Sequence, residues 1–383
     1  MRFPEFTEEW ERCKVSELLD FYSTNSLCWE QLEYDTNAMM NLHYGLIHVG
    51  LPTMVDLAKD KLPNIKEDNM PKNFELSKEG DVAFADASED TNEVAKAIEF
   101  YNLAGKTVVC GLHTIHGRDN KHKTVVGFKG YAFSSTAFHN QIRRIAQGTK
   151  IYSISTKNFS ECYIGLPSKP EQTKIATLFR LIDERISTQN KIIEDLKKLK
   201  SAIAETIFNT VQGHIAILST ICSVIKGKQV NGEELLEKGE YYVMNGGVTP
   251  SGYYDQYNTP AETISISEGG NSCGYVQYNK APFWSGGHCY TLQDIIDKEV
   301  DNQYLFHYLK RCESSIMNLR IGTGLPNIQK KDLENFRIML PPSKIQKEIA
   351  TCLTAIEDKI GIEVHWLACA QKEKHHLLRQ MFI

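Results

Sequence analysis

Two kinds of loop in this 383-residue chain carry side chains suited to binding a polyanion. The stretch GLHTIHGRDNKHK (Gly111–Lys123) lies between two strand-like runs and is crowded with His, Arg and Lys, which donate hydrogen bonds to phosphates and base edges. Further along, glycine pairs, tyrosines and amides combine in three stretches, Asn245–Asn258, Glu262–Tyr278 and Ala281–Tyr290. Such glycine-rich loops suit nucleic-acid contact, but they also suit the ordinary surface of a β-rich domain.

The motifs that would indicate catalysis are absent from the sequence. Gly105–Lys106–Thr107 resembles the end of a phosphate-binding loop, but Phe100 stands where the first glycine is needed. No NPPY-type or DPPY-type tetrapeptide for methylating a base amine is present. His113 and His116 have HxxH spacing without a third ligand nearby, which favours a loop role over a metal site. We therefore expect a binding protein with no catalytic residues and no metal.

The charge of the chain is unevenly distributed. The formal net charge is -5, and residues 1–105 carry 9 Lys or Arg against 21 Asp or Glu. Residues 106–160 carry 9 Lys or Arg against the single acidic residue Asp119. This distribution predicts a basic surface on the first domain, although a solvated run of charges is the simpler alternative.

The location expected for the protein is a reducing cytoplasm. No apolar run is long enough to span a membrane, and the N-terminal residues MRFPEFTEEWERC have no apolar core typical of a signal peptide. The ten cysteines are scattered, with neither the spacing of a zinc site nor that of a disulfide framework.

A repeat organises the chain. The segment from Leu166 to Phe208 recurs from Leu340 to Phe382, with every equivalent pair 174 positions apart. Apolar residues in both copies recur at alternating steps of four and three, which predicts two long helices of the coiled-coil kind. Two polar residues interrupt this apolar seam at the same two places in both copies, namely Gln189 and Lys200 in the first and Glu363 and Lys374 in the second.

These four polar residues suggest a register for an antiparallel helix pair. If facing residues have numbers that add up to 563, Lys200 faces Glu363 and Gln189 faces Lys374. Buried polar residues cost stability but fix register and orientation, so we take this register as a hypothesis.

Each helix follows a globular segment of short strands and glycine-containing turns. In the first segment the strand-like runs are Leu46–Val49, Asp81–Ala85, Thr107–Cys110, Thr124–Phe128 and Lys150–Ile154. The fold class expected is α/β (α+β): two β-rich domains with two long antiparallel coiled-coil helices, in a pseudo-two-fold tandem repeat. The domain boundaries expected are 1–165 and 213–339 for the β-rich domains, and 166–212 and 340–383 for the helices.

The residues that start the two helices resemble a known family. LPSKPEQTKIATLFRLIDERI and LPPSKIQKEIATCLTAIEDKI are similar to the helix start of the specificity (S) subunit of type I DNA restriction-modification systems, where LPP-x-x-EQ-x-x-IA is typical. Ser168 replaces the second proline in the first copy, and Ile345 replaces the usual Glu in the second. The segments Ala85–Asp90 and Gly111–Thr114 also resemble recurring parts of the family's target recognition domains, and the resemblance covers essentially the whole chain.

The resemblance implies a recognition role. Each target recognition domain would bind one half of a bipartite, asymmetric DNA sequence, and the helices would fix the spacing of the halves. Two methyltransferase (M) subunits would bind S-adenosylmethionine and methylate adenine in each half. Two restriction (R) subunits would cut unmethylated double-stranded DNA with ATP and Mg. No cofactor is expected in this chain.

Candidate DNA-binding residues follow from charge and from hydrogen-bonding capacity. In the first domain they are Arg118, Lys121, Lys123, Arg143, Arg144 and Lys150. In the second domain they are Asn245, Ser251, Tyr253, Tyr254, Asn271, His288, Arg320 and Lys330.

Two other interpretations are open. A coiled-coil scaffold that pairs partner proteins would have the same helices but no sequence-specific DNA binding. The specificity portion of a fused restriction and methylation enzyme would need a methyltransferase motif, and these 383 residues contain none.

Overall fold

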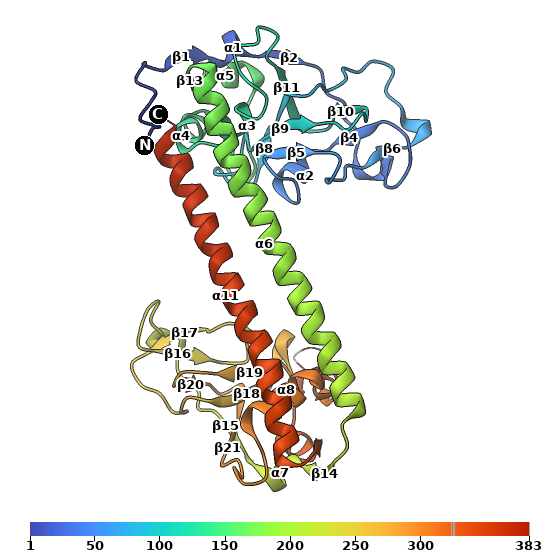
Figure 1. The fold of residues 1–383 in the computed structure, drawn as a ribbon, viewed down its shortest axis with the longest axis vertical. Coiled ribbons are helices and arrows are strands. Elements are labelled where there is room, and N and C mark those ends of the chain that lie inside the picture. Colours follow the sequence, from blue (N-terminus) through green and yellow to red (C-terminus); the bar gives the residue numbers. More distant parts are fainter. Residues whose placement is uncertain (323, 325, 383) are drawn as a thin grey trace. The chain divides into compact units, whose positions relative to one another are not determined.

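The computed structural model describes residues 1–322, 324 and 326–382 (Figure 1). The chain folds into two compact units, which we call unit 1 (Met1–Asn190 with Trp366–Ile383) and unit 2 (Lys191–His365). The long helix α6 (Lys169–Thr210) passes from unit 1 into unit 2, and the long helix α11 (Ser343–Met381) passes back. Each unit therefore consists of a β-rich domain and a segment of both long helices.

Unit 1 is built on two sheets. The first has the order β2-β11-β7-β9-β5 and is antiparallel except for the parallel pair β5 and β9. Its strands are β2 (Asp20–Tyr22), β5 (Met54–Asp56), β7 (Val82–Ala85), β9 (Ala97–Asn102) and β11 (Thr114–Arg118). The second sheet, with the order β10-β4-β6-β3, comprises β3 (Leu32–Glu33), β4 (Met40–Leu42), β6 (Asn64–Ile65) and β10 (Val108–Cys110).

Two strand pairs and five short helices complete unit 1. The pairs are β1 (Glu11–Lys14) with β13 (Tyr163–Leu166) and β8 (Ala87–Ser88) with β12 (Tyr152–Ser153). The helices are α1 (Val15–Leu18), α2 (Tyr44–His48), α3 (Lys129–Phe133), α4 (Thr136–Ile145) and α5 (Thr156–Ser160).

Unit 2 has the same plan with fewer strands. Its main sheet, β15-β21-β18-β19, comprises β15 (Ser223–Lys226), β18 (Thr263–Ser267), β19 (Val276–Asn279) and β21 (Cys289–Gln293). Its smaller sheet, β17-β16-β20, comprises β16 (Tyr241–Met244), β17 (Gly252–Tyr254) and β20 (Trp284–Ser285). The strand pairs are β14 (His214–Ile217) with β24 (Arg337–Leu340) and β22 (Arg320–Ile321) with β23 (Asn327–Ile328). The short helices are α7 (Leu218–Ile221), α8 (Asn302–Arg311), α9 (Glu313–Met317) and α10 (Lys330–Glu334).

The tandem repeat therefore extends through the β-rich domains. The order β2-β11-β7-β9 in unit 1 matches β15-β21-β18-β19 in unit 2, and the parallel pair β4 and β10 matches the parallel pair β16 and β20. In both units the first strand of the β-rich domain pairs antiparallel with the strand that directly precedes a long helix. These pairs are β1 with β13, before α6, and β14 with β24, before α11. The predicted fold class, two β-rich domains and two long helices in tandem, is confirmed.

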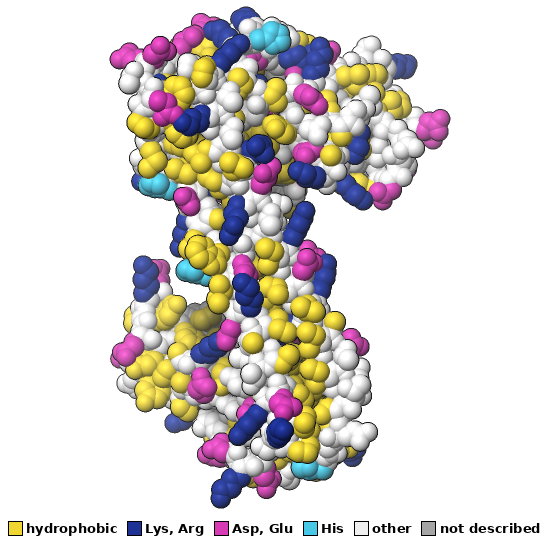
Figure 2. Space-filling model, in the orientation of Figure 1, with side chains coloured by type: hydrophobic (Ala, Val, Ile, Leu, Met, Phe, Trp, Pro, Cys, Tyr) yellow, Lys and Arg dark blue, Asp and Glu magenta, His cyan; other side chains and the backbone are white. Residues whose placement is uncertain are grey.

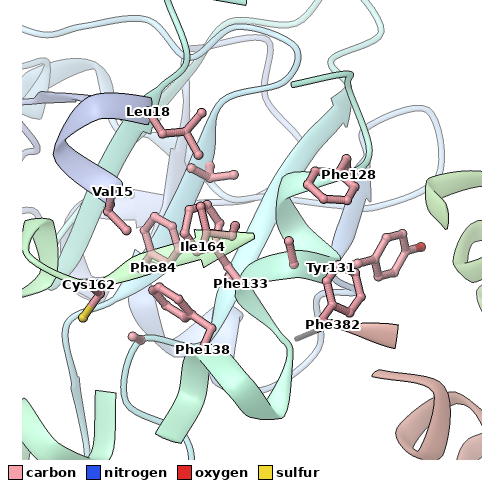
Figure 3. Close-up of a cluster of buried hydrophobic side chains, with 14 of the residues drawn as sticks. Val15, Leu18, Phe84, Phe128, Tyr131, Phe133, Phe138, Cys162, Ile164 and Phe382 are labelled. Carbon is pink, nitrogen blue, oxygen red and sulfur yellow. The ribbon is translucent and has the colours of Figure 1, made fainter. Parts of the chain in front are cut away.

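Aromatic side chains fill the core of unit 1. Phe84 on β7 packs edge-on against Phe133 of α3, and Phe138 of α4 lies against the same ring (Figure 3). Phe382, which follows α11, is also buried in this core and stacks on Phe179 of α6. The C-terminal end of the described chain is thus part of the first core.

The glutamine shared by the two helix starts has a structural role. Gln172 accepts a hydrogen bond from Val125 N and donates to the carbonyls of Lys123 and Pro167. Gln346 accepts from the amide of Asp301 and donates to the carbonyls of Glu299 and Pro341. Both side chains are buried, so each one satisfies loop backbone that water cannot reach.

The helices pair antiparallel within each unit, but not in the expected register. Lys200 forms an ion pair with Glu357 in unit 2, and Lys374 forms one with Asp183 at 2.6 Å in unit 1. These two ion pairs are equivalent under the 174-residue repeat, and in both the residue numbers add up to 557 rather than 563. The expected partners of the two lysines, Glu363 and Gln189, are therefore corrected to Glu357 and Asp183. A lysine at the seam extends its ammonium to a carboxylate at the solvent-facing edge, where the charge keeps part of its hydration.

We predict that Lys200→Glu destabilises unit 2 by about 1–2 kcal/mol, because the Lys200 side chain is 19% exposed and Glu357 is half-exposed. The ion pair does not make Lys200 a stronger base, because burial and the ammonium of Lys310 lower its pKa to about 8. Adding Glu357→Lys should restore most of the loss in urea unfolding. The control is Lys200→Glu combined with Glu363→Lys. If stability recovered only in this second double variant, the register in which residue numbers add up to 563 would be correct.

Three segments differ from their sequence-based expectation. Leu46–Val49 was expected as a strand but lies largely in α2, whose first turn is capped by His43 Nδ1 accepting from Gly45 N. Thr124–Phe128 forms no strand, because side chains take up its first amides: Thr124 N donates to Asp119 and Val125 N to Gln172. Gly111–Lys123 was expected as a polar loop but contains the buried strand β11.

Candidate nucleic-acid interface

The ends of three strand segments meet at one place in unit 1. His43 follows β4, Asp86 follows β7, and His113 lies between β10 and β11. The amide of Asp86 donates to the carbonyl of His113 at 3.0 Å, and His113 Nδ1 lies 3.1 Å from Asp86 Oδ1. The Gly111 amide donates to the carbonyl of Leu42 at 2.8 Å and so continues the parallel pairing of β10 with β4. The imidazole of His113 therefore lies against the carboxylate of Asp86 where these strands end, at a place that we call the rim of the domain.

Unit 2 repeats this arrangement. The amide of Glu268 donates to the carbonyl of His288 at 2.9 Å, and His288 Nδ1 lies 3.4 Å from Glu268 Oε2. The Gly286 amide donates to the carbonyl of Met244 at 2.8 Å, as Gly111 does in unit 1. The next strand is held in the same way, because Ile154 N donates to the carbonyl of Asp86 and Ile328 N to that of Glu268. We call Asp86 with His113, and Glu268 with His288, the two His–carboxylate pairs.

Only glycine fits where the two sheets of each unit meet. A Cβ on Gly111 would lie 2.4 Å from Asn41 Nδ2, and a Cβ on Gly286 would lie 2.6 Å from Asn245 Oδ1. Distances under 3 Å require the neighbouring atoms to move, and here both asparagine side chains are held through their Oδ1 atoms, which accept from Asn25 Nδ2 and from the His288 amide. The glycines of GLHT and SGGHC thus position the histidine two places later.

The surroundings of the two pairs are different. In unit 1, a series of aromatic rings leads away from His113. The ring centroid of Tyr44 lies 5.2 Å from that of His113, the centroid of His43 lies 4.7 Å from that of Tyr44, and the centroid of Trp29 lies 4.4 Å from that of His43. In unit 2, Asn245 Oδ1 accepts from the His288 amide at 3.1 Å, and Lys226 pairs with Glu268. The same backbone frame therefore carries different hydrogen-bonding groups.

Basic side chains lie close to each pair. In unit 1, Arg143 at the end of α4 donates to Asn92, in the loop after Asp86, and Arg144 and Lys150 are exposed on the segment that follows. In unit 2, Arg320 on β22 is exposed and pairs across the strands with Ile328, which is bonded to Glu268. On the face shown in Figure 2, basic and acidic side chains are interspersed, so that face carries no continuous field of one sign.

The structure separates the candidate residues of unit 1 into two groups. Arg143, Arg144 and Lys150 are exposed on α4 and the segment after it. Lys121, which is also exposed, and Lys123, which is partly buried, bond to the segment around β1 and α1, at Glu17 O and at the Glu11 carboxylate.

Arg118 is a correction, because it is buried. Its guanidinium donates to Asp81 and Glu75 and lies 4.5 Å from the Tyr22 ring. The strand β11 carries it into the interior, so it holds the fold together and is not available to DNA.

The candidates of unit 2 also separate. Asn245, Asn271, His288 and Arg320 lie on loops or strands that hydrogen-bond around Glu268, and Asn271, His288 and Arg320 are exposed. The others lie elsewhere in the unit: Ser251 just before β17, Tyr253 and Tyr254 on β17, and Lys330 at the start of α10. Sequence reasoning did not single out Asp86 and Glu268, and only the recurrence of the His–carboxylate pair in both units reveals them.

The HxxH spacing of His113 and His116 does not form a metal site. His116 is buried with Nε2 2.7 Å from Asp81 Oδ2, while His113 bonds to Asp86. Within residues 1–322, 324 and 326–382, no group of three or more His, Cys, Asp or Glu side chains could hold a metal ion. In the same part of the chain, no helix has the length and apolarity needed to span a membrane.

Comparisons with known proteins agree with this organisation. The family model described as the type I restriction modification DNA specificity domain matches residues 60–198 and 217–368. A putative type I specificity subunit of Mycoplasma pneumoniae is 34% identical over 144 residues, which cover 37% of this chain and only 38% of that relative's length. The putative specificity subunit of the type I restriction enzyme MjaX from Methanocaldococcus jannaschii is 27% identical over 318 residues, covering 74% of this chain and 73% of the relative.

Solved structures share the fold. The S subunit of a type I restriction-modification system from M. genitalium has a TM-score of 0.69 at 18% identity, covering 100% of this chain and 97% of that one. A chain from a study of complex assembly and conformational transition of the type I R-M system has a TM-score of 0.56 at 16% identity, covering 97% of both chains. Since the family model matches two segments that together make up most of the sequence, the chain belongs to the type I restriction-modification DNA specificity family, a family of specificity subunits rather than of enzymes.

Proposed function

We propose that each unit of this chain recognises one half of a bipartite, asymmetric sequence in double-stranded DNA. The observation that carries the proposal is the rim built twice on one backbone frame, with Asp86 and His113 in unit 1 and Glu268 and His288 in unit 2. A shared frame with different neighbouring side chains suits a protein that positions two similar surfaces on two different sequences.

The two long helices set the spacing of the halves in this proposal. Each helix contributes residues to both units, and the Gln172 and Gln346 hydrogen bonds tie each helix start to its own β-rich domain. A rod of hydrogen-bonded backbone is stiffer than a loop and suits a fixed spacer.

We further propose that partner subunits supply the chemistry. Two methyltransferase (M) subunits dock on the chain, bind S-adenosylmethionine and methylate adenine, and two restriction (R) subunits use ATP and Mg to cut unmethylated DNA. The adenine has to leave the stack for methylation, so the specificity chain holds the flanking duplex. The complex works in the cytoplasm. The partners share in binding the phosphates, because this chain has a net charge of -5 and a negative charge by itself opposes binding to DNA.

The alternative function is a scaffold that pairs partner proteins through its helices without contacting DNA. The paired helices alone fit both functions. The rim of hydrogen-bonding groups at the His–carboxylate pairs favours DNA recognition.

Methylome sequencing of cells that express this chain with its neighbouring M subunit tests the proposal. We expect a motif of two short specified halves around a gap of fixed length. Exchanging residues 214–339 for the equivalent segment of another specificity subunit should change one half only, because the β-rich domain of unit 2 lies within that segment. Exchanging residues 1–165 is the matched control and should change the other half. If the complex assembles and no new methylation is found, the scaffold is the better function.

A further inference from the structure

We propose that the two His–carboxylate pairs are the base-recognising groups of this protein, with His288 in unit 2 and His113 in unit 1 accepting a hydrogen bond from the exocyclic amine of an adenine or cytosine in the major groove. This inference rests on the proposed function, and it names the side chains that determine part of the specificity.

The first argument is that the pairs recur although the sequences around them do not align. His113 and His288 are 175 positions apart, and Asp86 and Glu268 are 182 positions apart, whereas the helices repeat at 174. Insertions therefore separate these residues, yet each unit brings a carboxylate and a histidine together at the same strand ends through equivalent backbone hydrogen bonds. The fold alone does not require this chemistry, because most neighbouring positions differ and the shared glycines, Gly111 and Gly286, account only for the backbone.

The second argument is the position of the two partners relative to solvent. The side chains of His288 and His113 are 65% and 49% exposed, whereas those of their partners Glu268 and Asp86 are 9% and 29% exposed. A carboxylate beneath an exposed imidazole is the arrangement that fixes a ring's orientation while leaving its far edge accessible. The histidines therefore present their Nε2 edges outward.

The third argument is the environment of Glu268. Its Oε1 pairs with Lys226 and accepts from Tyr290 OH at 3.1 Å. Its Oε2 is buried and accepts no hydrogen bond within the described residues, with His288 Nδ1 at 3.4 Å. A small rotation of the His288 ring would complete this bond, so the pair is adjustable where a ligand would dock.

The fourth argument is backbone strain at His113. Its φ angle is +54°, a left-handed conformation that is uncommon for residues other than glycine and that is shared by six other non-glycine residues among those described. Hydrogen bonds on both sides of it, from the Asp86 amide to its carbonyl and from its ring to Asp86, hold this conformation. Such strain concentrates at functional positions.

The ligand chemistry follows from the tautomer. When Nδ1 carries the proton and donates it to the carboxylate, Nε2 of the neutral ring is a hydrogen-bond acceptor. In the major groove the donors are the N6 amine of adenine and the N4 amine of cytosine. The different neighbours, Asn245 in unit 2 and Tyr44 in unit 1, then make the two units select different flanking bases.

The test compares His288→Ala with the control His214→Ala, which removes an exposed histidine from β14 of the same unit. Both variants are assembled with the M subunit and scored by methylome sequencing and by competition with duplexes altered at each specified base pair. We expect His288→Ala to reduce the discrimination at one specified base pair of one half by about tenfold or more, and to leave the other half unchanged. His113→Ala should have the same effect on the opposite half, and His214→Ala should change neither.

Glu268→Gln separates recognition from folding, since the amide preserves the size of the side chain but removes the negative charge that faces the His288 ring. It should relax the same position as His288→Ala. If His288→Ala and Glu268→Gln both leave the discrimination unchanged at every base pair, the inference is wrong. If a variant no longer supports methylation, its discrimination is measured by the competition assay instead. Failure of this inference can be distinguished from failure of the proposed function. If the proposed function were wrong, even the unmodified chain would give no bipartite methylation motif.

Discussion

Asp81→Asn is expected to destabilise unit 1 by about 3 kcal/mol, the largest loss we predict for a single polar group. Asp81 is buried, and it accepts hydrogen bonds from Arg118 Nε at 2.9 Å and Arg118 Nη2 at 2.8 Å, with His116 Nε2 at 2.7 Å. Asparagine keeps the shape but removes the negative charge. The Arg118 guanidinium would then remain buried with the half-buried Glu75 as its one anionic partner among the described residues. Hydrogen exchange of the β7 and β11 amides measures the loss.

The stability difference between the unmodified chain and Asp81→Asn should depend on pH, because only the unmodified chain has the Asp81 carboxylate. Burial alone would raise the pKa of Asp81, but hydrogen bonds with His116, Arg118 and the Lys78 amide outweigh burial and lower it. A lowered folded-state pKa means that Asp81 stabilises the fold above its unfolded-state pKa of about 3.9, and that this stabilisation is lost as pH falls through the folded-state value. The deficit of Asp81→Asn should therefore be constant from neutral pH to about pH 5 and shrink below pH 4. Asp68→Asn, at an exposed position, is the control; a deficit independent of pH would contradict this account.

Phe382→Ala is expected to destabilise unit 1 by about 3 kcal/mol, although the residue lies at the opposite end of the sequence from most of that unit. The Phe382 ring is 5% exposed, and its centroid lies 5.9 Å from that of Phe179, 6.0 Å from Phe128 and 6.0 Å from Trp10. Removing it leaves a cavity among aromatic side chains that cannot collapse without moving α6. Hydrogen exchange of the unit 1 amides measures the effect.

The repeat supplies a matched comparison for this variant. Phe208 is the equivalent of Phe382, and its ring lies 5.8 Å from that of Tyr304 and 5.4 Å from that of Tyr308 in unit 2. Phe208→Ala should therefore lower the protection of unit 2 amides and leave unit 1 unchanged, while Phe382→Ala does the reverse. If both variants affected the same unit, the assignment of the helix ends to separate cores would be wrong.

The sequence by itself determined the tandem plan and the two long helices. Helix periodicity is a local property: the alternation of apolar residues over about 40 positions is visible without knowing what the helix contacts. The matched glutamines Gln172 and Gln346 were also visible, since the gap between the two copies is constant at 174. The strand Val82–Ala85 was predictable for the same reason, because a short apolar run marks a buried strand.

The tertiary structure decided the helix register, the burial of Arg118 and the composition of the candidate site. An apolar seam pairs equally well in neighbouring registers, so the choice of Glu357 over Glu363 depends on where a lysine ammonium finds a hydrated carboxylate. Arg118 has the composition of a DNA-binding residue, and only the strand pairing of β11 with β7 places it on Asp81.

The His–carboxylate pairs come from strand ends that are 27 positions apart in unit 1 and 20 in unit 2, and unequal loop lengths hide their equivalence in the sequence. Backbone hydrogen bonds between strands fix where loops meet, whereas loop length is free to vary, and for that reason the rim could be found only in three dimensions.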